Sequence, residues 1–537
     1  MLFWIEAFVD HYSGFLGEDR ADDVGVGAST GQVEQAMGVV ELQSKFEVLL
    51  DDVLDGDRWP QDWPMRLLVL GKQRAGVVLD HRVGQVGYEL LHRAVILICI
   101  VQSFRRVTYP WLFGPPTIDS AKIGKTIPSL HMPGPTYVRR VSPLERLFIA
   151  NTLLNPPFVN QLVIEGTGTP DIEELQRALD TCSDANPGST LALPDVSEPL
   201  CWQSGRRPRI TRILAPDWDG SSDATAPFLS APLDPVSGPS CEILLVLGRR
   251  ASTFLIFRSL HAVMDGIGTL LWANDFMSAL RREPPTGHPS TITDADVAQR
   301  LMPGRTRPRP PADALHPLGK PGPADSRKTF SWQRVTIRKR FESHHLGVVA
   351  ATLNELARQH AEDDAARQAR VRFNLPCDLR RHAASEKTTG NMFGPLFVEM
   401  TADAHSDRFG LQLLRQMYER QELIPLSFLE HVTAASLDQW QAILADLLEQ
   451  QHQQGRYIFT ATLSQLGQLG SAALSGPEFA ATSAYFVPPL ADQVCFVACN
   501  GFDRHTEITI ALPLRFCHDD GLGVLAERIH DAIARRT

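Results

Sequence analysis

The chain has 537 residues, more than one ordinary hydrophobic core accommodates, so two or three domains are expected. Hydrophobic residues make up 43% and charged residues 21%, which is typical of globular rather than disordered proteins. A formal net charge of −10 argues against the basic surface that nucleic-acid-binding proteins normally carry.

Eight cysteines are scattered along the chain without a Cys-x-x-Cys pair, as in a reduced, cytoplasmic protein. Cys495 and Cys499 share one face of an apolar run, and we interpret them as core residues rather than metal ligands. The longest apolar run near the amino terminus, 94–101, is far shorter than the roughly 20 residues that cross a bilayer. The first residues also lack the basic start of a signal peptide, so we expect no membrane span.

The first 135 residues carry no motif and little sustained periodicity. Proline and tryptophan interrupt this stretch near 59–64 and 109–116. Three interpretations of this N-terminal extension stay open: a small helical addition, a segment that does not pack, or a stretch upstream of a mis-assigned start. In the third case Met132 is the true start, and 537 − 131 = 406 residues remain.

Organised sequence begins near Tyr137. Within 141–147, Ser142 as an N-cap, Pro143 at the first helical position and Glu145 at the third predict the start of a helix. Apolar periodicity then predicts a strand at 158–165, a helix at 170–182, and short strands at 190–193 and 209–215.

Two apolar runs, 241–247 and 253–259, predict a β-hairpin around a turn at 248–252. His261 follows, and Asp265 and Gly266 complete a His-x-x-x-Asp-Gly string. Glycines 266 and 268 allow a tight turn into an apolar helix that ends at 280. The arrangement holds one imidazole at the end of a strand, although the string alone is more typical of a surface turn.

Residues 284–326 are rich in proline, which predicts an extended crossover without regular structure. The second half contains Asp378-x-Arg380 and then Gly390-Asn391, just before an apolar run at 395–400. Periodicity in this half predicts helices at 346–360, 407–423, 436–451 and 521–535, and strands at 331–339, 457–462, 485–487, 494–498 and 507–512.

This order of signals resembles the chloramphenicol-acetyltransferase-like superfamily, which includes condensation domains of peptide synthetases, BAHD acyltransferases and wax-ester synthases. The resemblance covers roughly 136–537, and 141–147 is similar to the opening motif of condensation domains. It implies an α+β protein with an N-terminal acyltransferase subdomain at 136–283, a crossover linker at 284–326 and a C-terminal acyltransferase subdomain at 327–537. Each subdomain is expected to be a mixed sheet flanked by helices, with a cleft or tunnel between the two.

The resemblance also implies roles for the motif residues. His261 is the expected general base, because neutral imidazole can remove a proton from an attacking hydroxyl or amine at physiological pH. Asp265 is expected to pair with an arginine and hold the loop, with Arg380 as the first choice of partner and Arg258 as the second. Gly266 is expected to permit the turn.

Three further residues are candidates at the site. Asn391 is expected to stabilise a turn there, with a substrate contact as the other interpretation. Thr462 and Ser464, near the end of the predicted strand 457–462, are candidate oxyanion donors. The resemblance implies no metal, cofactor or covalent intermediate, because the acyl-CoA or phosphopantetheinyl thioester is itself the co-substrate.

The chain departs from the family pattern at Leu260, where condensation domains and wax-ester synthases usually carry a second histidine. The Asp-Phe-Gly-Trp-Gly motif of plant enzymes is also absent, and 499–503 occupies the comparable region. No adenylation or carrier domain adjoins, so a stand-alone member is expected.

The expected function is acyl transfer in secondary metabolism, from a CoA or carrier-protein thioester to an alcohol or amine. One alternative is a non-catalytic docking or gating partner of a peptide or polyketide synthetase, which the missing first histidine favours. Another is an epimerase- or cyclase-like relative that acts on carrier-bound substrates.

Overall fold

The computed structural model describes residues 137–194, 199–322, 330–361, 368–401, 406–489 and 495–535, with the pairs 68–69 and 77–78. Residues 16–131 form a unit of their own, in which the described residues are the antiparallel strands β1 (Leu68–Val69) and β2 (Val77–Val78). The three interpretations of the N-terminal extension therefore lie outside the described residues. No helix among the described residues is long and apolar enough to cross a membrane.

A five-stranded mixed sheet underlies the first half. Its order is β14–β4–β9–β8–β7, in which β7 runs parallel to β8 and every other pair is antiparallel. The predicted hairpin of β8 and β9 is confirmed. The strands and the turn are β4 (Val159–Thr167), β7 (Ile210–Leu214), β8 (Cys241–Leu247), η3 (Arg249–Ala251), β9 (Thr253–Leu260) and β14 (Ala480–Val487).

Helices α5 (Ile172–Ala185) and α6 (Gly266–Leu280) pack together, and both contribute to the core beneath this sheet. The predicted capping box starts α4 (Pro143–Leu154): Glu145 N donates to Ser142 Oγ at 3.2 Å, and Ser142 N donates to Glu145 Oε2 at 3.1 Å. A small sheet and two 3-10 turns complete this half: β3 (Val138–Arg140), β5 (Leu191–Ala192), β6 (Cys201–Ser204), η1 (Pro187–Thr190) and η2 (Pro227–Ser230).

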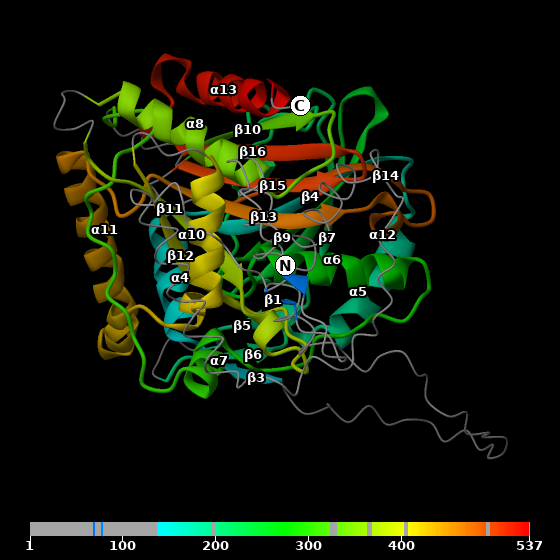
Figure 1. Ribbon diagram of the computed structural model, residues 1–537. Helices are drawn as coiled ribbons and strands as arrows, with labels where there is room; N and C mark the ends of the chain where they lie inside the picture. The colour runs from blue at the N-terminus through cyan, green and yellow to red at the C-terminus, as the bar shows by residue number, and fades with distance from the viewer. Residues whose placement is uncertain are drawn as a thin grey trace. The chain divides into compact units, whose positions relative to one another are not determined.

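A six-stranded mixed sheet underlies the second half, in the order β10–β16–β15–β13–β11–β12. Helices α8 (His345–Gln359) and α13 (Gly521–Arg535) lie side by side over it (Figure 1). The second core lies beneath them and contains Cys495 and Cys499, as predicted. The strands are β10 (Phe330–Ile337), β11 (Val371–Asp378), β12 (Phe393–Met400), β13 (Ala461–Leu469), β15 (Cys495–Phe502) and β16 (His505–Pro513).

The helices of this half follow the predicted periodicity closely, because each buries one apolar face. The closing helix has the predicted bounds, whereas α11 extends three residues past its predicted end and α10 ends at Tyr418, five residues before its predicted end. The helices and 3-10 turns are α8 (His345–Gln359), η4 (Arg380–His382), α10 (Ser406–Tyr418), η5 (Gln421–Leu423), η6 (Ser427–Ala434), α11 (Leu437–Gln454), α12 (Ser471–Leu474), η7 (Leu514–Phe516), η8 (His518–Asp520) and α13 (Gly521–Arg535).

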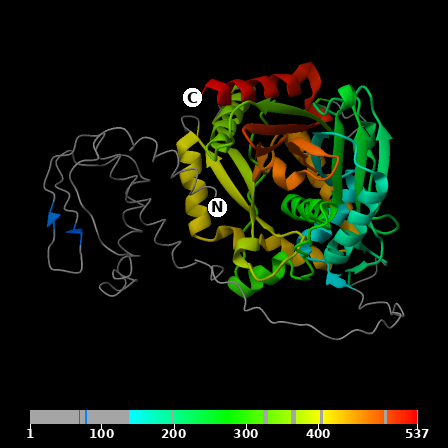
Figure 2. The same ribbon diagram turned by 90° about the vertical axis from the view of Figure 1, so that its right-hand side faces the viewer.

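The two halves share a strand. The two sheets occupy opposite sides of the part formed by residues 137–535 (Figure 2). Strand β14 belongs to the second half in sequence but pairs with β4 in the first sheet. Arg334 on β10 also joins the sheets: its Nη1 lies 2.8 Å from Glu165 Oε2 and its Nε 2.9 Å from Glu507 Oε2. A boundary at 327 therefore does not separate the sheets, although the predicted α+β class with mixed sheets flanked by helices is confirmed.

The crossover contains a helix, so the prediction of no regular structure in 284–326 was wrong. Helix α7 (Asp294–Leu301) starts with a capping box in which Thr293 Oγ1 accepts from Asp296 N at 3.2 Å. Val297 is fully buried beside Met392 of the second half. The sequence contains the Thr-x-x-Asp pattern of a helix N-terminus, but the surrounding prolines favoured the prediction of an irregular crossover.

Candidate active site

His261 immediately follows the last residue of β9 and is half-buried. Two contacts hold its backbone: its N–H donates to Phe158 O at 3.4 Å, and Asn391 Nδ2 donates to its carbonyl oxygen at 2.8 Å. The preceding Leu260 is fully buried in the first core. The strand end therefore directs Leu260 into the core and presents His261 from the loop that follows.

The contacts of Nδ1 bear on the tautomer of the imidazole. Its Nδ1 lies 3.3 Å from the Met264 carbonyl oxygen, which can only accept, so we assign the ring proton to Nδ1 and the free lone pair to Nε2. Asn160 on β4 holds the Met264 carbonyl, because its Nδ2 donates to that oxygen at 2.6 Å, and the same Nδ2 lies 3.3 Å from Nδ1. Asn160 is almost completely buried.

Three phenyl rings surround the imidazole. Phe148 on α4 stacks on it with 4.2 Å between ring centroids and 23° between planes, while Phe158 and Phe393 lie at 5.5 Å and 6.1 Å. Burial among these rings penalises the charged form and lowers the pKa of His261 to about 4, against a smaller opposing effect of the Met264 carbonyl. The imidazole is consequently neutral at physiological pH, which a proton acceptor requires.

Asp265 forms the expected ion pair with Arg380 across the two halves. Arg380 Nη2 and Nη1 lie 3.0 Å and 3.1 Å from Asp265 Oδ1 and Oδ2. Backbone N–H groups complete the shell: Gly268 N donates to Oδ1 at 2.6 Å and Met392 N to Oδ2 at 2.8 Å. Both oxygens are thus engaged in holding the start of α6 against the second half, an arrangement that suits a positioning role.

Arg258, the second choice of partner for Asp265, was wrong. It is fully buried on β9 and pairs instead with Glu242 on β8, while its Nε donates to Gln161 Oε1 at 3.1 Å. The reason is strand register, because Glu242 and Gln161 are the residues directly opposite Arg258 on the two neighbouring strands.

Gly266 is the first residue of α6 and has no left-handed φ, so its role is close packing rather than a turn. A Cβ there would meet Phe486 Cζ at 3.2 Å and Leu466 Cδ2 at 3.4 Å. The stricter requirement lies at Gly268, where a Cβ would lie 2.0 Å from the carbonyl oxygen of Thr389. Gly268 therefore allows the contact between the halves beside the Asp265–Arg380 pair.

Asn391 contacts the loop that carries His261, as expected of a residue that stabilises a turn. Its Nδ2 also lies 3.5 Å from Glu145 Oε1, and Glu145 pairs with Arg139 at 2.8 Å. Arg139 in turn donates to Val263 O at 3.2 Å. These buried groups connect the loop to α4 and β3, and burial raises the pKa of Glu145 against the opposing effect of Arg139.

Thr462 and Ser464 lie at the start of β13, because this strand spans 461–469 rather than the predicted 457–462. Thr462 is buried, and its Oγ1 accepts a hydrogen bond from Asn374 Nδ2 at 3.2 Å. Side chains alternate along a strand, so the two hydroxyls share one face of β13. Their role as oxyanion donors stays a prediction.

Sequence reasoning missed the residues that surround the imidazole most closely. In the sequence, Asn160 is a polar residue within an apolar predicted strand, and Phe148 is part of the first predicted helix. Neither position indicates a contact with His261. Phe158 and Phe393 carried no signal, because they meet His261 only in the fold. Within the described residues, no group of three or more His, Cys, Asp or Glu side chains is arranged to hold a metal ion.

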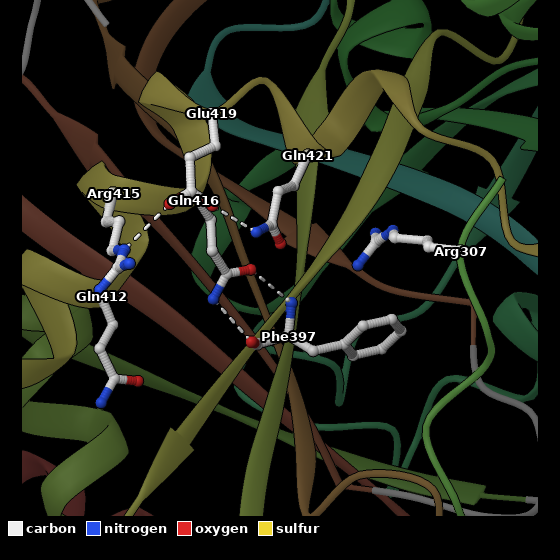
Figure 3. Close-up of a pocket in the computed structure, with 7 residues that line it drawn as sticks. All are labelled: Arg307, Phe397, Gln412, Arg415, Gln416, Glu419 and Gln421. Atoms are coloured by element: carbon white, nitrogen blue, oxygen red, sulfur yellow. Dashed lines mark hydrogen bonds and ion pairs between the residues drawn. The ribbon is translucent and has the colours of Figure 1, made fainter. Parts of the chain in front are cut away.

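A separate hollow of about 290 Å³ lies beside the edge strand β12, between Phe397, Arg307 and helix α10 (Figure 3). Several of its polar groups are already engaged. Gln416 bonds the backbone N and O of Phe397 at 3.2 Å and 2.7 Å, Arg415 pairs with Glu419, and Arg307 lies over the Phe397 ring. None of the residues that line it contacts His261 in the described structure, so we do not assign it to the site.

No protein-family model and no curated protein matches the chain. Solved structures do match. A variant of the starter condensation domain of rhizomide synthetase, in complex with C8-CoA, aligns with a TM-score of 0.52 at 14% identity, over 74% of this chain and 95% of that chain. The condensation domain from Monacolin K polyketide synthase aligns with a TM-score of 0.51 at 12% identity, over 74% and 96%. Identities this low show a shared fold and nothing further.

Proposed function

We propose that this chain, which has the chloramphenicol-acetyltransferase-like fold of condensation domains, is an acyltransferase. It moves an acyl group from a CoA or carrier-protein thioester to a hydroxyl or amine acceptor, as a cytoplasmic enzyme of secondary metabolism. The observation that carries the proposal is His261, whose Nδ1 is bound to the Met264 carbonyl and whose neutral Nε2 is left to act as the base.

The proposed reaction needs only the thioester as co-substrate. Nε2 of His261 takes the proton of the acceptor while the acceptor atom bonds to the thioester carbonyl carbon. The tetrahedral intermediate then collapses, the C–S bond breaks, and the proton passes from His261 to the departing sulfur. Hydroxyls on β13, those of Thr462 and Ser464, are the proposed donors to the oxyanion, and Asp265 with Arg380 positions the loop.

Leu260 bears on the non-catalytic alternative. A histidine at this position would lie in the core, because Leu260 is fully buried among the residues of the first sheet. Leucine in place of the first histidine therefore takes no side chain away from the face that carries His261. This supports a catalytic role over a docking or gating role.

Replacing His261 with alanine tests the proposal. Octanoyl-CoA is incubated with a panel of alcohols and amines, with thiol release and product mass as readouts. His261→Ala should lower kcat roughly 100- to 10,000-fold, because the general base is lost, while the melting temperature stays close to that of the wild type.

The matched control is His530→Ala, since His530 is exposed on α13 and should leave transfer unchanged. Undiminished turnover by His261→Ala would exclude His261 as the base. Absence of product from the wild type, with retained binding of an acyl-carrier protein, would favour the docking alternative.

A further inference from the structure

A cluster of buried charged groups lies beside the His261 loop and has no part in the proposed chemistry. Arg139 on β3 and Glu145 on α4 are almost completely buried, with 2.8 Å between Nη2 and Oε1. Asp294, the first residue of α7 in the crossover, faces the same cluster, because the charges of Asp294 and Glu145 interact. The crossover thus adds a second carboxyl group to an ion pair that is already complete.

The cluster contains two carboxyl groups for one guanidinium. Among the described residues Asp294 forms no ion pair, and its Oδ1 is buried without a hydrogen-bond partner. Arg139 is engaged elsewhere, since its Nη2 contacts Glu145 and donates to the Val263 carbonyl at 3.2 Å. Ionisation of both carboxyl groups would bury a negative charge without a counter-ion, which is strongly unfavourable. One bound proton removes that excess charge.

The hydrogen bonds decide which carboxyl group carries the proton. Glu145 Oε2 accepts from Ser142 N at 3.1 Å and from Trp202 Nε1 at 3.2 Å, and its Oε1 faces Arg139, so this group is held as a carboxylate. The side-chain donor to Asp294 is the hydroxyl of Ser142 alone. Burial raises the pKa of Asp294 to about 7; the Ser142 hydroxyl opposes this effect, and the charge of Glu145 adds to it.

Helix α7, which begins at Asp294, supports the loop of the candidate site. Val297, one turn further along α7, is fully buried and belongs to the same apolar cluster as Met392. Met392 N in turn donates to Asp265 Oδ2 at 2.8 Å. A helix that leaves this position therefore removes the packing behind one of the hydrogen bonds that hold Asp265.

The other titratable groups around the start of α7 are engaged with one another or exposed, and none gives Asp294 a counter-ion. Asp296 belongs to the helix cap, and Arg300 is exposed in the last turn of α7. The remaining contacts are Tyr137 Oη to Ser290 O at 2.9 Å, Ser290 Oγ to Glu386 Oε2 at 2.6 Å, and Glu422 Oε1 to His382 Nε2 at 2.9 Å, with Arg381 also paired to Glu422.

We propose that Asp294 and Glu145 share one proton that fastens α7 to the His261 loop, and that loss of this proton loosens the crossover as the pH rises. The raised pKa of Asp294 gives the direction. The folded chain binds a proton that the unfolded chain releases, so the stabilising contribution is complete below about pH 4 and is lost as the pH rises through about 7. The inference goes beyond the proposed function and is tested without substrate.

Hydrogen exchange of the full chain, followed by mass spectrometry at pH 5 and pH 8, tests the proposal. After correction for the chemical effect of pH on exchange, protection of residues 290–302 should fall about tenfold or more, since one pKa unit is a tenfold change in the linked equilibrium. Residues 521–535 of α13 are the internal reference and should keep their protection. Exchange reports rare opening, so the transfer rate can stay constant meanwhile. Unchanged protection of 290–302 would overturn the proposal.

Asp294→Asn identifies the group responsible. The amide has nearly the same shape and stays neutral, so protection of 290–302 should change less than about twofold between pH 5 and pH 8. Asp296→Asn is the matched control on the same helix; Asp296 is exposed, and its loss should weaken the cap equally at both pH values. A fall in Asp294→Asn as large as in the wild type would overturn the proposal, as would its disappearance in Asp296→Asn. If Asp294→Asn does not fold, the exchange of the wild type decides.

Discussion

At the scale of single residues, the base of the proposed reaction depends on one buried amide. Asn160 and the Nδ1 of His261 share the Met264 carbonyl oxygen, and this shared acceptor orients the ring. The phenyl rings set the protonation state, because they lower the pKa of His261 to about 4. The proposed role of His261 as the base therefore rests on two features that sequence reasoning missed.

The pH profile checks this account. The base is active when neutral, so the transfer rate of the wild type should be constant from about pH 8 down to pH 5 and fall as the pH drops through about 4. Asn160→Ala should lower kcat about tenfold or more with little change in KM, since a misoriented imidazole loses mainly transition-state stabilisation.

Asn500→Ala is the matched control. Asn500 is equally buried and donates to Ala484 O at 2.8 Å, away from His261. Each substitution should destabilise the protein by about 1–3 kcal/mol through a lost buried hydrogen bond. An equal loss of kcat in both variants would refute the positioning role of Asn160.

At the scale of elements, the loop before α6 is held in place from the second half. Arg380 in η4 bonds Asp265, the Thr388 carbonyl at 3.1 Å and the Gly390 carbonyl at 2.6 Å. Asp378 on β11 also contacts Arg380, and burial raises the pKa of Asp378 against the opposing effect of that guanidinium. Helix α6, the His261 loop and η4 thus act as one assembly.

Arg380→Met should destabilise the protein by about 3–5 kcal/mol, because it leaves the buried Asp265 carboxylate unpaired. The double variant Asp265→Asn/Arg380→Met should recover part of that stability but not activity. Chemical denaturation measures both. Arg370→Met is the control, since the exposed Arg370 pairs with Glu399 near the surface and should leave the unfolding midpoint almost unchanged.

Additive effects of the single substitutions at 265 and 380 would contradict direct coupling between the two side chains. A double variant that regains full transfer activity would show that the ion pair does not position the loop. Either result would reduce the pair to a general stabilising contact.

At the scale of the whole molecule, the two halves cannot be separated at the crossover, because β14 completes the sheet of the first half. Without it, β4 would become an exposed edge strand, which is a site of aggregation. Arg334 adds ion pairs to Glu165 and Glu507 across the same junction.

Splitting the chain between Gly322 and Phe330 tests this interdependence. A fragment of residues 132–322 made alone should aggregate, whereas co-expression with residues 330–537 should give a soluble pair that copurifies. Size-exclusion chromatography distinguishes these outcomes. A folded, monomeric N-terminal fragment would show that β14 is not needed for the first sheet.

The sequence alone determined the local structure, and with the family resemblance it indicated His261 as the candidate base. Ser142 and Glu145 three residues apart, the hairpin of 241–259, and the closing helix 521–535 all rest on contacts between near neighbours in the chain. Family resemblance added the pairing of Asp265 with Arg380, which are far apart in sequence. The order of these signals was enough to predict the two-part α+β fold, which is confirmed.

Only the tertiary structure decided what surrounds the histidine and where one half ends. Phe148, Asn160 and Phe393 come from three separate elements, so no local pattern indicates that they meet at His261. The strand exchange of β14 depends in the same way on long-range hydrogen bonds. Periodicity reports which face of an element is buried but not which partner buries it, and the chemistry of this imidazole depends on its partners.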